Sequence, residues 1–235
     1  MIHPILKQLP LSFNANEEIS FDNFYAGRNS EVVQYLRKIV DTQLLENSYL
    51  CSTESTGRSH LLYATCRYAN NQGISSIYIP LSQAISLKPD ILTELESISL
   101  ICIDDLQRIA GNRAWEEALF HLYNKTQQCK SRLLIAANGL PKEINLTLKD
   151  LESRLTWGVT FQLQGLEDQE KINVLMMRAQ NRGMILPFDV AKYILTHCPR
   201  HMSTLMSALD VLDKTSLSAQ RRLTIPFVKN VLQIN

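Results

Sequence analysis

An octamer from Ser52 to Ser59 contains the residues whose types and spacing have the clearest chemical meaning. Phosphate-binding loops have the pattern G-x-x-x-x-G-K-[ST], in which backbone N–H groups and the lysine contact phosphate oxygens and the hydroxyl binds Mg²⁺. Gly57 and Ser59 occupy their usual positions in this pattern. Ser52 replaces the first glycine, and Arg58 replaces the lysine with a wider, planar head that favours bidentate contacts with oxygen atoms. The octamer therefore predicts a loop that still binds phosphate but is poorly suited to hydrolysis.

We assign nucleotide binding to the whole loop and the first residues after it, which are Ser52, Thr53, Glu54, Ser55, Thr56, Gly57, Arg58, Ser59 and His60. The residues from Leu61 to Ala69 have the spacing of a helix, whose N-terminus would present its dipole and free N–H groups to phosphate. The alternative is a polar turn between a strand and a helix that holds no ligand, because degenerate motifs of this length often occur by chance.

A second acidic feature follows the apolar residues 99–103, which end in the pair Asp104 and Asp105. In nucleotide-hydrolysing folds a strand of this kind ends in an aspartate that holds Mg²⁺. We assign that role to Asp104, directly or through water, with Ser59 as the hydroxyl ligand. Asp105 occupies the place of a catalytic acid that is often Glu, and its shorter side chain disfavours fast turnover. A strand that simply exits into a turn is the alternative.

The composition of the 235 residues argues against several classes of protein. A net charge of +1 with 20% charged residues provides no global basic field, so electrostatic capture of duplex DNA is not expected. The five cysteines are odd in number and form no C-x-x-C pair, and the N-terminus lacks a secretory signal, which together indicate the reducing cytoplasm. No apolar run approaches the roughly 18 residues of a membrane-spanning helix, so we expect no membrane association.

The hydrophobic spacing predicts an α/β fold followed by a helical domain. Strand-like and helical runs alternate from about Phe21 to about residue 165, which predicts a parallel sheet covered by helices on both faces. The pattern then changes to helices only, expected at residues 168–182, 188–198, 202–214 and 225–234. We therefore predict an extended tail of residues 1–20, an α/β nucleotide-binding domain of residues 21–165 and a small helical lid of residues 166–235.

Several segments together resemble the AAA+ ATPase superfamily, and within it the Hda-type inactivators of the replication initiator DnaA. The loop from Gly57 to Leu62 has Arg in the place of Lys, as Hda-type proteins characteristically do. The segment from Phe21 to Gly27 is similar to the family's entry segment on the adenine side. Trp115 and three further segments are also similar to those of Hda-type proteins: Leu133–Ile135, Leu151–Leu155 and Leu223–Lys229. The resemblance covers nearly the whole chain and implies an AAA+ α/β domain followed by a helical lid.

The resemblance also implies roles for three residues that composition and spacing alone do not single out. Asn138 matches the first sensor near the γ-phosphate, and Arg200 matches the second sensor in the lid, which contacts phosphate in cis. Arg154 matches the arginine finger, which acts in trans on a neighbour's nucleotide. Without the resemblance, Asn138 would be an ordinary turn residue and the two arginines would be solvated surface charges.

The tail contains a segment similar to the short motif by which bacterial proteins bind the replicative sliding clamp, formed by Gln8, Leu9, Leu11 and Phe13. Pro10 keeps the peptide extended, and Leu11 and Phe13 can anchor in an apolar pocket. The glutamine amide can both donate and accept a hydrogen bond. The same alternating apolar residues could instead cover the protein's own surface.

The resemblance implies ADP, or another adenine nucleotide, with Mg²⁺ as cofactor, and the DnaA initiator and the DNA polymerase III β sliding clamp as partners. DNA would be contacted mainly through the clamp, and self-association is left open. In this scheme Arg154 stimulates the hydrolysis of DnaA-bound ATP, so the chain is a negative regulator of replication initiation with at most weak ATPase activity of its own. The alternatives are an active AAA+ ATPase of the helicase-loader or clamp-loader type and a passive clamp-binding module with a vestigial nucleotide site.

Overall fold

The computed structural model describes residues 19–42, 44–53, 55–95, 97–219 and 222–234. The predicted clamp-binding segment and Glu54 lie outside these residues. The helices and strands follow one another as α1 (Ser30–Asp41), β1 (Ser48–Cys51), α2 (Arg58–Asn71), β2 (Ser76–Pro80), α3 (Leu81–Ala84), β3 (Leu100–Asp104), α4 (Arg113–Cys129), β4 (Arg132–Ala137), α5 (Lys149–Leu155), β5 (Val159–Gln162), α6 (Asp168–Asn181), α7 (Phe188–His197), α8 (Met202–Ala219) and α9 (Ile225–Leu232).

The five strands form one sheet in the order β2-β3-β4-β1-β5, and each neighbouring pair is parallel. Parallel neighbours require crossover connections, which the helices between the strands supply. β1 lies between β4 and the outer strand β5, so the loop that follows it emerges between these two strands at the carboxyl ends of the sheet. The predicted parallel α/β fold is confirmed.

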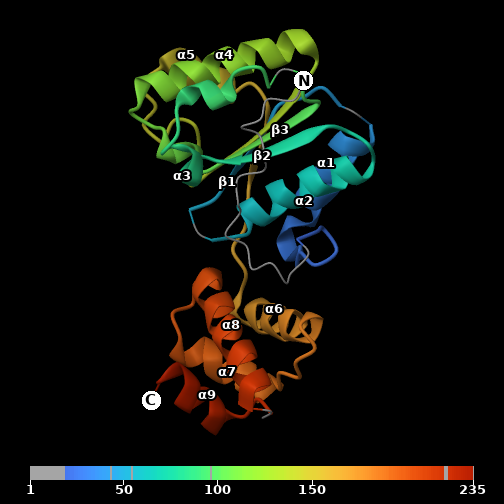
Figure 1. Cartoon of the computed structure of the whole chain (residues 1–235), viewed down its shortest axis with the longest axis vertical. Coiled ribbons are helices and arrows are strands. Elements are labelled where there is room, and N and C mark those ends of the chain that lie inside the picture. The colour runs from blue at the N-terminus through green and yellow to red at the C-terminus, as the bar shows by residue number, and fades with distance from the viewer. Residues whose placement is uncertain (1–18, 43, 54, 96, 220–221, 235) are drawn as a thin grey trace. The chain divides into compact units, whose positions relative to one another are not determined.

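Alternating residues of the central strands pack against different helices, as the two faces of a strand require. On one face, Tyr49, Ile101 and Ile135 join the core under α4 and α5. On the other face, Leu50, Cys102 and Leu134 join the core under α1 and α2. Figure 1 shows α1 and α2 on one side of the sheet and α4 and α5 on the other. Ile19 and Phe21 are buried in the second of these cores, so the packed part begins slightly earlier than predicted.

Apart from residues 54–56, the chain divides into two compact units between Gln164 and Gly165, and the second unit contains α6 to α9 around its own apolar core. A capping box between Glu167 and Glu170 starts α6. Gly183, expected to end this helix, follows it with a φ of +76°. The helical ranges agree with the expected ones except that α8 continues to Ala219. Among the described residues, no helix is long and apolar enough to cross a membrane.

Candidate functional site

The predicted phosphate-binding loop connects β1 with the N-terminus of α2 at the carboxyl edge of the sheet. Gly57 adopts a φ of +95°, a left-handed conformation that side chains strongly disfavour. A Cβ atom built on Gly57 would lie 2.7 Å from Cε2 of Phe24. The loop therefore requires glycine at this position for both its backbone conformation and its space. Thr53, Ser55 and Thr56 lie in the loop itself.

Arg58, the residue in the place of the usual lysine, turns back onto the start of the loop. Its guanidinium donates hydrogen bonds to the backbone oxygen of Ser52 and to Ser52 Oγ, the second at 2.8 Å. Both residues that depart from the usual pattern are thus partners of each other. The arginine thus connects the first residue of α2 with the first residue of the loop, which a lysine point charge would do less specifically.

The segment before α1 packs against the first turn of α2. The Phe24 and His60 rings have centroids 5.2 Å apart, and His60 Nε2 lies 2.8 Å from the carbonyl oxygen of Ser20. These contacts place an aromatic ring beside Gly57. The segment that resembles the family's adenine-side entry segment therefore lies against the loop.

Asp104 is the last residue of β3, and only 1% of its surface is exposed. Its Oδ2 accepts a hydrogen bond of 2.8 Å from the Tyr78 hydroxyl, and its Oδ1 accepts one of 2.8 Å from the Asp105 N–H. The Ser59 hydroxyl is a third partner. Burial raises the pKa of Asp104 despite these hydrogen bonds, and the neighbouring Asp105 charge adds to the rise. A buried carboxylate beside a hydroxyl is a site that a cation would stabilise.

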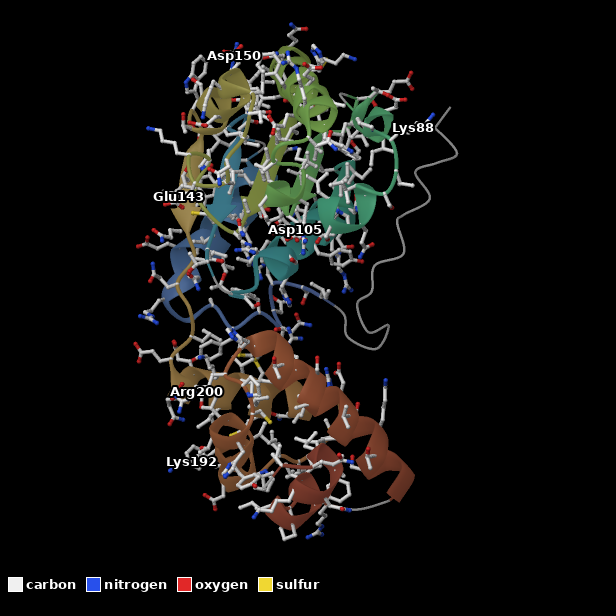
Figure 2. All side chains as sticks on the ribbon, turned by 90° about the vertical axis from the view of Figure 1, so that its left-hand side faces the viewer. Lys88, Asp105, Glu143, Asp150, Lys192 and Arg200 are labelled. Carbon is white, nitrogen blue, oxygen red and sulfur yellow. The ribbon has the colours of Figure 1, made fainter. Side chains whose placement is uncertain are left out.

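Asp105 and Asn138 are connected through Gln107, a residue that the sequence did not single out. Gln107 Nε2 donates to Asp105 Oδ1 at 3.1 Å, and Gln107 Oε1 accepts from the Asn138 N–H at 3.1 Å. Asp105 itself has a φ of +58°, which Asp tolerates better than most residues. Figure 2 shows Asp105 just beyond the end of β3. The structure thus brings the second acid and the predicted sensor together at the carboxyl edge.

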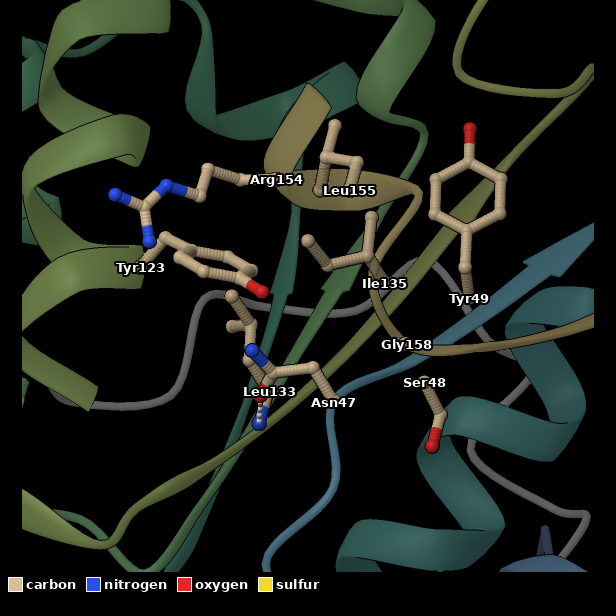
Figure 3. Close-up of a pocket in the computed structure, with 9 residues that line it drawn as sticks. All are labelled: Asn47, Ser48, Tyr49, Tyr123, Leu133, Ile135, Arg154, Leu155 and Gly158. Carbon is tan, nitrogen blue, oxygen red and sulfur yellow. Dashed lines mark hydrogen bonds between the residues drawn. The ribbon is translucent and has the colours of Figure 1, made fainter. Parts of the chain in front are cut away.

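Arg154 lies at the opposite edge of the sheet, in the last turn of α5. It lines a small cavity together with Asn47, Ser48, Tyr49, Tyr123, Leu133, Ile135, Leu155 and Gly158. Figure 3 shows Arg154 and Leu155 coming from α5, and Asn47 and Ser48 from the start of β1. The cavity has a volume of about 10 Å³, enough for about one water molecule and far too small for a nucleotide.

From Ser48, which lines this cavity, to Ser52 at the start of the predicted phosphate-binding loop, the chain of β1 spans about 13 Å at 3.3 Å per residue. The Arg154 guanidinium carbon lies 4.8 Å from the centre of the Trp157 ring. Among the described residues, no carboxylate forms an ion pair with Arg154. The structure therefore does not place Arg154 with the loop, Asp104 and Asn138 of its own chain.

Arg200 belongs to the helical unit, between α7 and α8 (Figure 2). Its Nη1 lies 3.0 Å from Oδ2 of Asp168, and 64% and 52% of the two side chains are exposed. An exposed pair of this kind contributes little to stability, typically below about 1 kcal/mol. The ion pair therefore holds Arg200 only weakly.

A family model described as the bacterial DnaA ATPase domain matches residues 15–162. The chain belongs to the bacterial DnaA ATPase family. A second model, described as the Hda lid domain, matches residues 168–232. The predicted resemblance to the DnaA branch of the AAA+ superfamily, with an Hda-type lid, is thus confirmed.

Solved structures similar to this chain include members of the DnaA family. Domain III of the Thermotoga maritima replication initiation protein DnaA has a TM-score of 0.80 at 17% identity, over 94% of this chain and 98% of that one. AMPPCP-bound DnaA from Aquifex aeolicus has a TM-score of 0.71 at 16% identity, over 87% and 68%. The RuvB Holliday junction branch migration motor of Thermotoga maritima has a TM-score of 0.70 at 13% identity, over 92% and 72%. At these identities the likeness establishes the fold.

The described residues of this DnaA-family chain fit a nucleotide with Mg²⁺ at the carboxyl edge of the sheet. No side chain caps the N-terminus of α2, so its first N–H groups remain for an anion. Gly57 allows a close approach of the backbone, and buried Asp104 lies beside the Ser59 hydroxyl. Tyr78 and Gln107, which the sequence analysis missed, complete the polar contacts of the two acids.

Proposed function

We propose that this protein is a negative regulator of the initiation of bacterial chromosome replication. It holds ADP with Mg²⁺, binds the DNA polymerase III β sliding clamp through its tail, and stimulates hydrolysis of the ATP bound to the DnaA initiator. The observation that carries the proposal is the location of Arg154 at the edge of the sheet opposite the phosphate-binding loop. A cationic residue so placed is suited to a partner's nucleotide rather than its own.

Nucleotide binding is supported by the geometry of the loop. Gly57, the uncapped N-terminus of α2 and buried Asp104 beside Ser59 form a group of phosphate-binding and cation-binding features. AMPPCP is bound in a DnaA structure with the same fold. We infer that Ser52 to His60 surround the phosphates, with Asn138 near their outer end. The resemblance assigns the role of second sensor to Arg200.

Weak hydrolysis by the protein itself is supported by two departures from the usual catalytic arrangement. Arg58 is bonded to Ser52 instead of extending as a lysine would. The second acid is the shorter Asp105, whose carboxylate accepts a hydrogen bond from Gln107. A nucleotide that is held but turned over slowly serves as a structural ligand, and its binding would shift the population toward a competent conformation.

Arg154 would act on the partner by placing positive charge where the γ-phosphate gains negative charge in the transition state. Fingers of this kind contribute on the order of 10³–10⁵ in hydrolysis rate. The planar guanidinium can donate two parallel hydrogen bonds to phosphate oxygens, which a lysine cannot. This chain supplies the charge, while the partner holds the ATP, its Mg²⁺ and the attacking water.

The decisive experiment measures single-turnover hydrolysis of ATP-loaded DnaA, with clamp-loaded DNA and each variant at equal clamp occupancy. Arg154→Ala should lose most of the stimulation, on the order of 10³-fold, and Arg154→Lys should recover little of it. Arg113→Ala is the matched control, because Arg113 is 81% exposed and pairs only with Glu117 on its own helix among the described residues. If Arg154→Ala stimulates as well as the parent protein, the action in trans is wrong.

Clamp binding rests on the tail sequence alone and has its own test. Replacing both Leu11 and Phe13 with Ala should abolish binding to the β clamp, because two apolar anchors carry most of the energy of a small interface. Leu140→Ala, which removes an exposed leucine of the α/β domain, should leave the affinity unchanged. Surface plasmon resonance on immobilised clamp compares the three proteins. Undiminished binding of the double variant would remove the clamp from the proposal.

Two outcomes would favour the other candidate functions. Substantial multiple-turnover ATP hydrolysis by the isolated protein would indicate an active AAA+ ATPase of the helicase-loader or clamp-loader type. Folding and clamp binding that are indifferent to nucleotide would indicate a passive clamp-binding module.

A further inference from the structure

Trp157 is a large apolar side chain that remains mostly in solvent. Its exposed fraction is 67%, whereas Trp115, the other tryptophan of the chain, is 2% exposed. A tryptophan at the surface loses contact with apolar surroundings, so its position calls for a cause. The Arg154 guanidinium carbon lies 4.8 Å from the centre of its ring, inside the roughly 6 Å range of a cation–π interaction.

The backbone on both sides of Trp157 is held by hydrogen bonds and close packing, which fixes the point from which its side chain extends. The Trp157 N–H donates to the Arg154 carbonyl oxygen at 3.1 Å, which closes the turn at the end of α5. Gly158 follows in close contact with Asn47, where an added Cβ would lie 2.1 Å from the Asn47 carbonyl oxygen. Val159 then begins β5 and donates to the same oxygen at 3.1 Å. The backbone at Trp157 is thus connected to α5 on one side and to the sheet on the other.

Stacking on a ring suits a guanidinium that must bind a phosphate. An arginine is long and loses considerable rotamer entropy when it is held in one conformation. A carboxylate partner would restrain it, but that partner would have to be displaced before phosphate could bind. The guanidinium carbon lies over the Trp157 ring, and a guanidinium that contacts a ring through its face keeps its N–H donors along its edges. Arg154 can therefore be restrained without losing the donors that the partner's phosphate requires.

We propose that Trp157 is a positioning residue, which restrains the Arg154 guanidinium so that it is held ready for a partner's nucleotide. This inference rests on the proposed function, because it concerns the efficiency of the same arginine. It assigns to Trp157 an effect on the rate of the stimulated hydrolysis and little effect on the affinity for the partner. An ordinary interface residue would change the affinity instead.

The contact itself can be tested on the isolated protein, independently of any partner. Labelling with 5-fluorotryptophan yields two ¹⁹F resonances, which Trp157→Phe assigns. Arg154→Ala should shift the Trp157 resonance and leave that of buried Trp115 in place, whereas Arg113→Ala should leave the Trp157 resonance in place. Arg154→Lys should produce a smaller shift, because its ammonium is a weaker ring partner. If Arg154→Ala leaves the Trp157 resonance unchanged, the two side chains do not interact in solution and the inference is wrong.

The functional arm measures single-turnover hydrolysis of ATP-loaded DnaA over a range of concentrations of each variant. Trp157→Ala should lower the rate at saturation roughly two- to fivefold, as expected for an exposed cation–π contact, and leave the half-saturating concentration unchanged. Trp157→Phe should restore most of the rate, since its ring still offers a face. A raised half-saturating concentration with an unchanged rate would make Trp157 a contact residue and refute the positioning role.

Failure of this inference and failure of the proposed function have different signatures. If Arg154→Ala does not stimulate hydrolysis but Trp157→Ala stimulates fully, only the role of Trp157 is wrong. If Arg154→Ala itself stimulates fully, the action in trans is wrong, and the role of Trp157 falls with it. Thermal denaturation of every variant, compared with Arg113→Ala, distinguishes these results from loss of folding.

Discussion

Gly57 illustrates how one residue of the loop combines two separate requirements. Its φ of +95° disfavours any side chain, and a Cβ would also meet the Phe24 ring at 2.7 Å. We expect Gly57→Ala to lower the free energy of unfolding by about 2–4 kcal/mol, from left-handed strain and from the clash together. ADP-dependent stabilisation should also be lost, because the backbone could no longer approach phosphate closely. Urea denaturation with and without ADP measures both effects.

The control for this substitution stands at the other end of the same helix. Gly73 has a φ of +74°, but nothing lies within 4 Å of the position that a Cβ would take. Gly73→Ala should therefore lower the free energy of unfolding by about 1–2 kcal/mol, through backbone strain alone. It should leave the stabilisation by ADP intact. Equal losses of stability in the two variants would show that the Phe24 contact does not constrain the loop.

We expect Asp104 to lower the free energy of unfolding of the ligand-free protein while it contributes to ligand binding. Its folded pKa is raised, mainly by burial, so its contribution to stability falls as pH rises from its ordinary pKa of 3.8 through the folded value. Asp104→Asn removes this cost, and an amide can still bond with Tyr78 and the Asp105 N–H. At pH 7 and without ligand, we expect the variant to be at least as stable as the parent. The part of ADP binding that depends on Mg²⁺ should disappear, as calorimetric titration with and without the metal would show.

At the scale of elements, Glu116 connects the start of α4 with the segment that leads into α5. Its carboxylate accepts hydrogen bonds from the Gly111 N–H at 2.7 Å, the Leu148 N–H at 2.7 Å, and both the Thr147 N–H and hydroxyl, at 3.2 Å and 2.7 Å. Burial by itself raises the pKa of Glu116, but the four hydrogen bonds outweigh it, and the pKa is lowered. This buried carboxylate therefore fixes where the helix bearing Arg154 begins.

We expect Glu116→Gln to destabilise the protein by about 2–4 kcal/mol at neutral pH, because its amide N–H groups would face donors. The lowered pKa sets the sign of the pH dependence. The contribution of Glu116 is fully present above its ordinary pKa of 4.5 and is lost as pH falls through the folded value. The difference between parent and variant in urea denaturation should therefore shrink below about pH 4.5.

The neighbouring Glu117 provides the control, since 46% of its side chain is exposed and it pairs with exposed Arg113 on the same helix. Glu117→Gln should change the free energy of unfolding by less than about 0.5 kcal/mol at any of these pH values. A loss in Glu116→Gln that stays constant down to about pH 3 would mean that the charge of Glu116 is not what holds the segment.

For the whole molecule, ligand linkage is the most direct prediction. A ligand that binds only the folded protein raises its stability by about 2.7 kcal/mol at one hundred times its dissociation constant. ADP with Mg²⁺ should therefore raise the melting temperature, while the purified protein turns over little ATP. Differential scanning fluorimetry against ADP concentration, with Gly57→Ala alongside, measures the shift. Absence of a shift at millimolar ADP would indicate a vestigial nucleotide site.

Much of the architecture could be predicted from local pattern, because periodicity and turn residues act over a few neighbours. The apolar run before Asp104 became β3, the alternation of strands and helices became a parallel sheet, and Gly183 ended α6. The phosphate-binding loop was recognisable for the same reason, since its residues are consecutive. The ends of elements were less predictable, and α8 continued beyond the expected Lys214 because helix boundaries depend on packing as well as propensity.

The sequence by itself thus determined the parallel α/β fold, the helical unit and the position of the loop between β1 and α2. Only the tertiary structure decided the partners of the polar residues: Tyr78 on Asp104, Gln107 between Asp105 and Asn138, and Trp157 under Arg154. Strand order also placed Arg154 and the loop at opposite edges of one sheet. The physical reason is that contacts between distant segments depend on the order of the strands in the sheet and on the path of the connecting helices. The spacing of residues within one segment does not specify either of them.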